Sequence, residues 1–302
     1  MDRGTKTYIL KRGSDALRPA RPSLEYEQAL NPQQWAVVSA EAGPALVVAG
    51  AGSGKTRTLI YWLAYLLEQG ADPSSVLLLT FTRKAAQEML ERAGLLIGSQ
   101  AEQVVGGTFH SIANLLLRRY GRIIGIDPGF TILDRTDSED LINLIRNQLG
   151  LSDKATRFPR KGTIAEMFSK TDNTMQPLEE VVLREFAHFA GHLDDLARLR
   201  KGYEAAKRER HLLDYDDLLV KLRDLLSGEE SVRLTVAQRF RSVLVDEYQD
   251  TNRLQADLIR KLAVTHNNVM AVGDDSQSIY AFRGATFRNI MDFPSLFPGT
   301  TI

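Results

Sequence analysis

The segment with the clearest chemistry is a glycine-rich loop at residues 49–56, with the sequence AGAGSGKT. It follows an apolar run, Ala45–Val48, and precedes a segment of helical character that begins at Thr58. Glycine-rich backbone can wrap closely around a triphosphate and present N–H donors to it at a helix N-terminus. In such a loop Lys55 reaches the β- and γ-phosphates, and the Thr56 hydroxyl binds Mg²⁺. The sequence therefore predicts a binding site for ATP or GTP.

The loop departs from the usual pattern at one position, because Ala49 stands where the first glycine normally lies. Small size is the main requirement there, so the departure is minor. The alternative is a glycine-rich turn that binds nothing. The strand before the loop, the helix after it and the Lys55–Thr56 pair favour the phosphate-binding interpretation.

Two adjacent carboxylates, Asp246 and Glu247, follow a second apolar run, Val243–Val245. A buried strand that ends in such a pair supplies what phosphoryl transfer to water requires. Asp246 can hold the water shell of Mg²⁺, and Glu247 can orient and deprotonate the attacking water. The alternative is a strand that simply ends in a polar turn, which the phosphate loop elsewhere in the chain disfavours.

A third segment, residues 272–285, reads VGDDSQSIYAFRGA. Gln277 can test for a γ-phosphate by hydrogen bonding, while Tyr280 and Phe282 offer faces on which nucleic-acid bases can stack. Taken without the other segments, these two aromatic residues are more typical of a core or a loop.

Five apolar runs are short enough to be buried parallel strands. Each is followed at once by polar residues, and ligands of open α/β sheets bind outside the carboxyl ends of the strands. The sequence therefore predicts an α/β fold with a parallel sheet and one shared site at its edge. The predicted strands are Ala45–Ala49, Val76–Thr80, Val104–Gly107, Ser242–Val245 and Val269–Gly273.

The long gap between the third and fourth predicted strands has helical periodicity throughout, as in Leu193, Leu196, Leu199 and Tyr203. We expect a mostly α-helical subdomain at 113–212, inserted into a discontinuous core formed by 26–112 and 213–302. Residues 1–25 lack periodicity and are expected to form a flexible arm.

The composition sets limits on function. Lys and Arg number 38, and so do Asp and Glu, so the chain lacks the overall basic excess that is common among nucleic-acid binders. There are no cysteines, which excludes disulfides and thiolate metal sites. No apolar stretch could span a bilayer, and the N-terminus has no signal-peptide pattern. We expect a cytoplasmic protein.

Taken together, the motifs resemble those of superfamily 1A DNA helicases of the UvrD/Rep/PcrA type, in the order found in that family. The resemblance covers most of residues 30–300 and implies a RecA-like ATP-binding core with a helical insertion. The matching segments are LNPQQWAVV (30–38), AGAGSGKTRTL (49–59), LLLTFTRKAAQEM (77–89), GGTFHSIA (106–113), LLDYDDLL (212–219), VLVDEYQDTN (243–252) and VGDDSQSIYAFRGA (272–285).

The resemblance implies the nucleotide site in more detail. Gln34 would bond the adenine and favour ATP over GTP, and Arg57 would lie near the nucleotide. The loop residues Ala51, Gly52, Ser53 and Gly54 would bind the phosphates together with Lys55 and Thr56. Thr56 and Asp246 would hold Mg²⁺. Lys55, Asp246, Glu247 and Gln277 would form the catalytic set.

The resemblance also implies a path for single-stranded DNA, including junctions with duplex DNA. Arg283 would belong to the network that couples this path to ATP. Phe282 stands where these helicases usually have Trp, which should weaken stacking without changing its kind. The residues expected to line the path are Thr80, Phe81, Thr82, Thr108, Phe109, His110, Tyr280 and Phe282.

The expected activity is that of an ATP-dependent 3′→5′ DNA helicase or translocase, of which this chain is the N-terminal half. The second RecA-like core would lie beyond Ile302, so residues 1–302 alone should be nearly inactive. Two alternatives stay open, namely the motor half of a RecB/AddA-like helicase–nuclease and an ATP-dependent DNA-binding switch without unwinding. The sequence does not distinguish the pathway, the oligomeric state or the proteins that load the enzyme.

Several weaker patterns have plain structural explanations. His110 could be a general base, but a structural or DNA-contacting role suits a single His better. The basic runs at 198–201 and 207–210 are more typical of a solvated helix face, whereas 157–161 could equally contact DNA. Asp214, Asp216 and Asp217 are spaced like a metal triad, but Asp214 is better interpreted as a helix N-cap.

Overall fold

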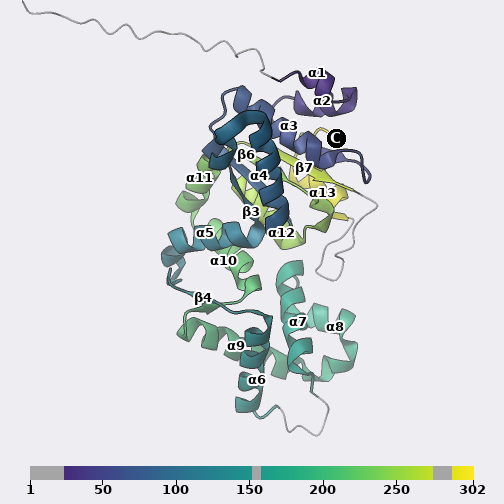
Figure 1. The fold of residues 1–302 in the computed structure, drawn as a ribbon. Helices are drawn as coiled ribbons and strands as arrows, with labels where there is room; N and C mark the ends of the chain where they lie inside the picture. The colour runs from purple at the N-terminus through teal and green to yellow at the C-terminus, as the bar shows by residue number, and fades with distance from the viewer. Residues whose placement is uncertain (1–23, 152–157, 275–287) are drawn as a thin grey trace, which may run out of the picture.

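The structure is a computed structural model, which describes residues 24–151, 158–274 and 288–302 (Figure 1). The predicted flexible arm therefore lies almost entirely outside the described residues. So do four residues with predicted roles, Gln277, Tyr280, Phe282 and Arg283.

The core of the fold is a sheet of five parallel strands in the order β1-β7-β6-β2-β3, which confirms the predicted parallel α/β sheet. Three strands have the predicted limits. Strand β1 ends one residue early, where the chain turns into the glycine-rich loop, and β3 is shifted by one residue because Thr108 still pairs with Thr80. The strands are β1 (Ala45–Val48), β2 (Val76–Thr80), β3 (Val105–Thr108), β6 (Ser242–Val245) and β7 (Val269–Gly273).

The three central strands are buried along their whole length, as expected for a parallel sheet covered on both faces. Successive side chains of a strand point to opposite faces. In β2, Leu77 and Leu79 join one hydrophobic cluster, while Val76 and Leu78 join the other. The continuous apolar runs in the sequence thus serve two separate cores.

Two groups of helices cover the sheet. The cluster that contains Leu78 is closed by α1 (Tyr26–Ala29), α2 (Pro32–Val38), α3 (Lys55–Glu68) and α4 (Arg83–Ile97). The cluster that contains Leu77 is closed by α5 (Phe109–Tyr120), α10 (Tyr215–Gly228), α11 (Glu230–Arg239), α12 (Arg253–Leu262) and α13 (Arg288–Leu296). None of the helices within the described ranges is long and apolar enough to cross a membrane.

A third hydrophobic cluster lies apart from the sheet, in the lower part of Figure 1. It is formed by α6 (Arg135–Gln148), α7 (Lys161–Thr174), α8 (Leu178–Glu185) and α9 (Leu193–Glu209). The chain enters this unit through β4 (Thr131–Ile132) and leaves it through β5 (Leu212–Leu213), and these two short strands pair in parallel.

Helix α5 differs from the other helices in the predicted insertion. Its residues Ala113, Leu116 and Leu117 belong to the cluster on the sheet, together with α10. Helical periodicity gives a helix an apolar face without showing which core receives it. The domain limits 113–212 stay a prediction. The buried side chains of α5 pack in the core on the sheet and not in the core of α6–α9.

A buried charge cluster joins α9 to the start of α10. The Lys207 ammonium contacts Asp214 Oδ2 at 2.6 Å and also contacts Asp217, and all three side chains are largely buried. Burial opposes the positive charge, but the two carboxylates outweigh it and raise the pKa of Lys207. Asp214 also caps α10, as predicted, because its Oδ1 accepts the Asp217 backbone N–H at 2.8 Å.

A second buried network joins α7 to the core. Asn252, the N-cap of α12, donates from Nδ2 to Asn173 Oδ1 at 2.7 Å. Asn173 in turn donates to Asp216 Oδ1 of α10, also at 2.7 Å. Both asparagines are buried, so these bonds replace water that the groups would otherwise bind.

The charge cluster generates a prediction about stability. Lys207→Ala should lower the free energy of unfolding by about 3–5 kcal/mol, because it leaves two buried carboxylates without their cation. Urea denaturation measures the loss. Lys201→Ala, on the exposed side of the same helix, is the matched control and should change stability by less than about 0.5 kcal/mol. A loss for Lys207→Ala as small as that of the control would contradict the assigned role.

Candidate functional site

The carboxyl ends of the parallel strands meet at one edge of the sheet, where a cavity of about 440 Å³ opens. Thr56 lines it from the first turn of α3, and Thr80, Phe81 and Thr82 line it from the end of β2. The turn after β6 contributes Asp246, Glu247, Gln249 and Asp250. The predicted phosphate-loop threonine and the predicted carboxylate pair therefore share one cavity.

The glycine-rich loop connects β1 to α3, and two of its glycines have left-handed backbone. Gly52 has φ 73° and Gly54 has φ 86°, a region that side chains rarely tolerate. At Gly54 a Cβ would also lie 2.6 Å from Gln34 Nε2. Ser53, between these two glycines, and Ala51, before the first of them, are both exposed. Because Gly54 caps α3 without a side-chain hydrogen bond, the first N–H groups of this helix are free of a capping side chain.

The Lys55 ammonium lies inside the loop. It donates to the carbonyl oxygens of Ala49 at 2.8 Å and Gly50 at 3.2 Å, and it pairs with Asp274 Oδ2 at 3.3 Å. Asp274 is 1% exposed, at the end of β7. The Lys55 ammonium is thus held next to the end of β7. The phosphate of a bound nucleotide could replace the two carbonyl oxygens as its partners.

Asp246 is a buried carboxylate with an unsatisfied oxygen. Among the described residues its Oδ1 has no hydrogen-bond partner, although the residue is only 7% exposed. Burial, and next the charge of Glu247, raise the pKa of Asp246 to about 6. Such an oxygen is costly unless a cation or a proton reaches it.

Glu247 has left-handed backbone, with φ 51°, which is uncommon for a residue other than glycine. This conformation starts the short 3₁₀ helix η5 (Tyr248–Asp250) and lets Glu247 line the cavity while Tyr248 enters the core. Tyr248 is fixed there edge-on to Phe293, with ring centroids 5.1 Å apart. Strained backbone of this kind is found at functional sites more often than elsewhere.

Gln34 and Arg57 fasten the first two helices to the loop. Gln34 completes a capping box with Asn31, and its Nε2 donates to the Ser53 carbonyl at 3.0 Å. Arg57 donates to the Ala29 carbonyl at 2.8 Å, and its guanidinium lies 5.2 Å from the centre of the Tyr61 ring. The bond of Gln34 to adenine and the position of Arg57 near the nucleotide both stay predictions.

The three threonines predicted to line a DNA path make hydrogen bonds within the fold. Thr82 caps α4 and Thr108 caps α5 through their side-chain oxygens, and the Thr80 hydroxyl donates to the Thr82 carbonyl at 2.8 Å. Phe81 is half-buried beside the cavity.

The ring of Phe109 is only 6% exposed and packs in the core cluster, so this conformation closes it to a stacked base. His110 lies edge-on to the exposed Tyr215, with ring centroids 5.8 Å apart. DNA contact at any of these positions stays a prediction.

Two parts of the site were missed in the sequence analysis, namely Gln249 and the pairing of Asp274 with Lys55. Gln249 is 2% exposed and donates from Nε2 to Glu247 Oε2 at 2.6 Å. Its Oε1 accepts the Asp274 backbone N–H at 2.9 Å. The contact with Glu247 is local, two residues away in the same turn, whereas the contact with Asp274 joins two strand ends that only the fold brings together. The only cue in the sequence was the position of Gln249 inside the carboxylate motif.

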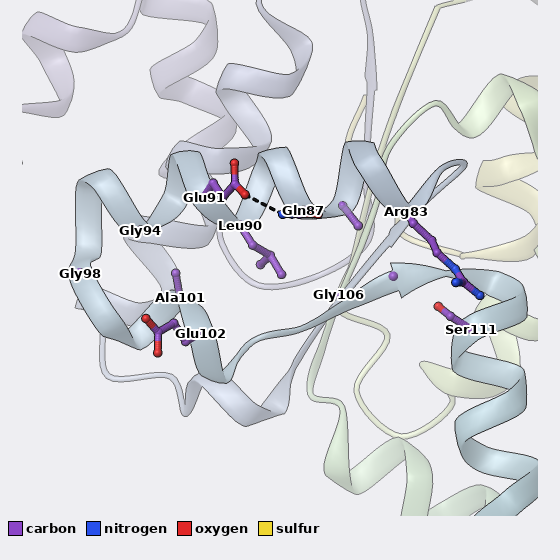
Figure 2. Close-up of a pocket in the computed structure, with 12 residues that line it drawn as sticks. Arg83, Gln87, Leu90, Glu91, Gly94, Gly98, Ala101, Glu102, Gly106 and Ser111 are labelled. Carbon is purple, nitrogen blue, oxygen red and sulfur yellow. Dashed lines mark hydrogen bonds between the residues drawn. The ribbon is translucent and has the colours of Figure 1, made fainter.

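A larger cavity, of about 660 Å³, lies beside α4 and the edge strand β3 (Figure 2). Its floor is Gly106 and Gly107, where a Cβ would meet Leu90 Cδ1 at 2.8 Å and Ser111 Oγ at 2.3 Å. Arg83 lines one end, whereas Glu91 and Gln87 bond to each other on α4. Of these two cavities the smaller is the candidate site, because both the phosphate-loop threonine and the carboxylate pair line it.

Comparison with known proteins identifies the family of this chain. The family model of the UvrD/REP helicase N-terminal domain matches residues 30–298. The ATP-dependent DNA helicase PcrA of Staphylococcus aureus is 37% identical over 270 residues, and so is the Staphylococcus epidermidis protein of that name. The match covers 89% of this chain but only 36% of either relative, so the chain spans about a third of their length. This chain belongs to the UvrD/REP helicase family, as its N-terminal domain.

Proposed function

We propose that the chain is the ATP-binding part of an ATP-dependent DNA helicase that moves 3′→5′ along single-stranded DNA. The observation that carries the proposal is the cavity that joins Thr56 to Asp246 and Glu247, next to the loop that holds Lys55. The relatives that match are named ATP-dependent DNA helicases, which supports the same activity for the natural protein.

The phosphates of ATP would bind to the N–H groups of residues 51–54 and to the Lys55 ammonium. Lys55 would exchange its carbonyl partners, Ala49 and Gly50, for phosphate oxygens while staying close to Asp274. Gln34, which already bonds the Ser53 carbonyl of the loop, would contact the adenine, and Arg57 would lie near the nucleotide.

The described residues fit Mg²⁺. Asp246 offers a buried oxygen that has no hydrogen-bond partner among these residues, and Thr56 lines the same cavity. Mg²⁺ prefers hard oxygen ligands such as a carboxylate and a hydroxyl. When bound, the ion would neutralise charge on the phosphates. Glu247, which lines the same cavity, would orient the attacking water and accept its proton.

Single-stranded DNA and its junctions with duplex DNA would lie over the ends of β2 and β3. The proposed contacts are Thr80, Phe81, Thr82, Thr108, Phe109 and His110, with Tyr280 and Phe282 beyond the described residues. We further propose that a second RecA-like core completes the ATP site, with Gln277 and Arg283 coupling ATP to movement. The protein would act on the bacterial nucleoid in the cytoplasm.

DNA-stimulated ATP hydrolysis by the natural full-length protein tests this proposal. Glu247→Gln should reduce kcat by at least about 100-fold, because it removes the general base but keeps the shape of the side chain. Binding of Mg·ATP should stay within a few-fold of wild type. The exposed Glu102→Gln is the control and should not affect turnover. Turnover without DNA stimulation, or insensitive to Glu247→Gln, would contradict a motor function.

Residues 1–302 alone should bind Mg·ATP weakly and hydrolyse it orders of magnitude more slowly than a protein that also contains the proposed second core, because that core would stabilise charge in the transition state. They should not unwind DNA. Calorimetry measures the binding, with Lys55→Ala as the variant expected to lose it while its circular dichroism is unchanged. Strand separation by this fragment, or equal affinity in Lys55→Ala, would refute the corresponding assignment.

Asp246→Asn should increase the stability of the Mg²⁺-free protein while it abolishes the effect of Mg²⁺ on nucleotide affinity. The folded-state pKa of about 6 lies above the unfolded value, so the buried charge costs stability fully above pH 6. The gain should be about 1–3 kcal/mol at pH 7.5 and should disappear as the pH falls toward 4. Urea denaturation with EDTA measures it, and a loss of stability at pH 7.5 would contradict the account.

A further inference from the structure

Gln249 spans the gap between the ends of two neighbouring strands. On one side its Nε2 donates to Glu247 Oε2 at 2.6 Å, and on the other its Oε1 accepts the Asp274 N–H at 2.9 Å. The side chain is 2% exposed, so water does not compete for either bond. An amide with both ends engaged in a buried site has one orientation.

The backbone of Gly273 packs closely against this amide. A Cβ at Gly273 would lie 2.9 Å from Gln249 Oε1 and 3.4 Å from the Gln249 backbone nitrogen. The glycine at the end of β7 therefore allows the amide to lie against the strand. The hydrogen bond from Gln249 and the left-handed backbone of Glu247 together define where the Glu247 carboxylate lies.

We propose that Gln249 is a positioning residue for Glu247 in ATP hydrolysis, an inference that rests on the proposed function. The amide bonds only one of the two carboxylate oxygens, Oε2. Within the described part of the chain, Oε1 has no hydrogen bond and is left to accept a proton from water. The orientation of the carboxylate is thereby fixed without blocking its lone pairs.

The same amide ties Glu247 to the strand end that holds the phosphate-loop lysine. The Asp274 carboxylate pairs with the Lys55 ammonium, and the Asp274 backbone N–H donates to Gln249 Oε1. A displacement of Asp274 when Lys55 changes partners would therefore reach the Glu247 carboxylate through one side chain. Errors of about 1 Å in such a group can cost about 100-fold in rate.

A purely structural role for Gln249 predicts a different pattern of substitutions. Gln249→Glu keeps the size of the side chain and the acceptor for the Asp274 N–H, but it sets a carboxylate against Glu247 in place of a donor. If Gln249 only filled buried space, this variant would be milder than Gln249→Ala. If Gln249 positions Glu247, Gln249→Glu should reduce ATP hydrolysis at least as much as Gln249→Ala does.

The experiment measures DNA-stimulated ATP hydrolysis by the natural full-length protein. Gln249→Ala should reduce kcat about 10- to 100-fold with KM for ATP within about threefold, since only the transition state loses an interaction. Gln249→Glu should reduce kcat at least as much. Gln87→Ala, an exposed glutamine on α4, is the control and should keep kcat within about twofold.

A double variant makes the test specific. Because Gln249 acts through Glu247, the variant with both Glu247→Gln and Gln249→Ala should be no slower than Glu247→Gln alone. Additive losses, a rise in KM with unchanged kcat, or Gln249→Glu within threefold of wild type would each overturn the inference. If Glu247→Gln itself hydrolyses ATP at the wild-type rate, the proposed function fails as well. Urea denaturation verifies that each variant is folded.

Discussion

The parallel pairing of β6 between β2 and β7 is the constraint on which the site depends. Asp246 continues this pairing, because its N–H donates to the Leu79 carbonyl at 3.0 Å immediately after β6 ends. The carboxylate pair is thus fixed by backbone hydrogen bonds relative to Thr80, and through β7 relative to Asp274 and Lys55. Residues almost two hundred positions apart in sequence are brought together by strand order alone.

Charge is concentrated at this edge at a cost to stability. Asp246 and Asp250 are both buried, and burial followed by the charge of Glu247 raises the pKa of each to about 6. The glycines of the loop and the left-handed Glu247 add conformational cost. A site selected for folding alone would carry fewer buried carboxylates and less strain, and the two extensive apolar clusters on the sheet offset these costs.

The features predictable from sequence were those that short-range chemistry dictates. The strands followed from apolar runs buried on both faces, the loop from glycines that take positive φ, and the Asp214 cap from an Asp-x-x-Asp pattern at a helix start. The packing of α5 was not predictable, because periodicity does not show which core an apolar face joins. The bond between Gln249 and Asp274 was not predictable either, since it depends on the distance between two strand ends.

The attachment of the helical unit to the sheet limits how the two can move. Its entry and exit strands pair with each other, and Asn173 on α7 is bonded to Asn252, which begins α12 just after the carboxylate turn. A hinge that let α6–α9 swing freely would break the bond between Asn252 Nδ2 and Asn173 Oδ1, and each of these two polar atoms would lose that partner, at about 1–3 kcal/mol each. Rotation of the helical unit therefore costs the least free energy when the segment between β6 and α12 turns with it.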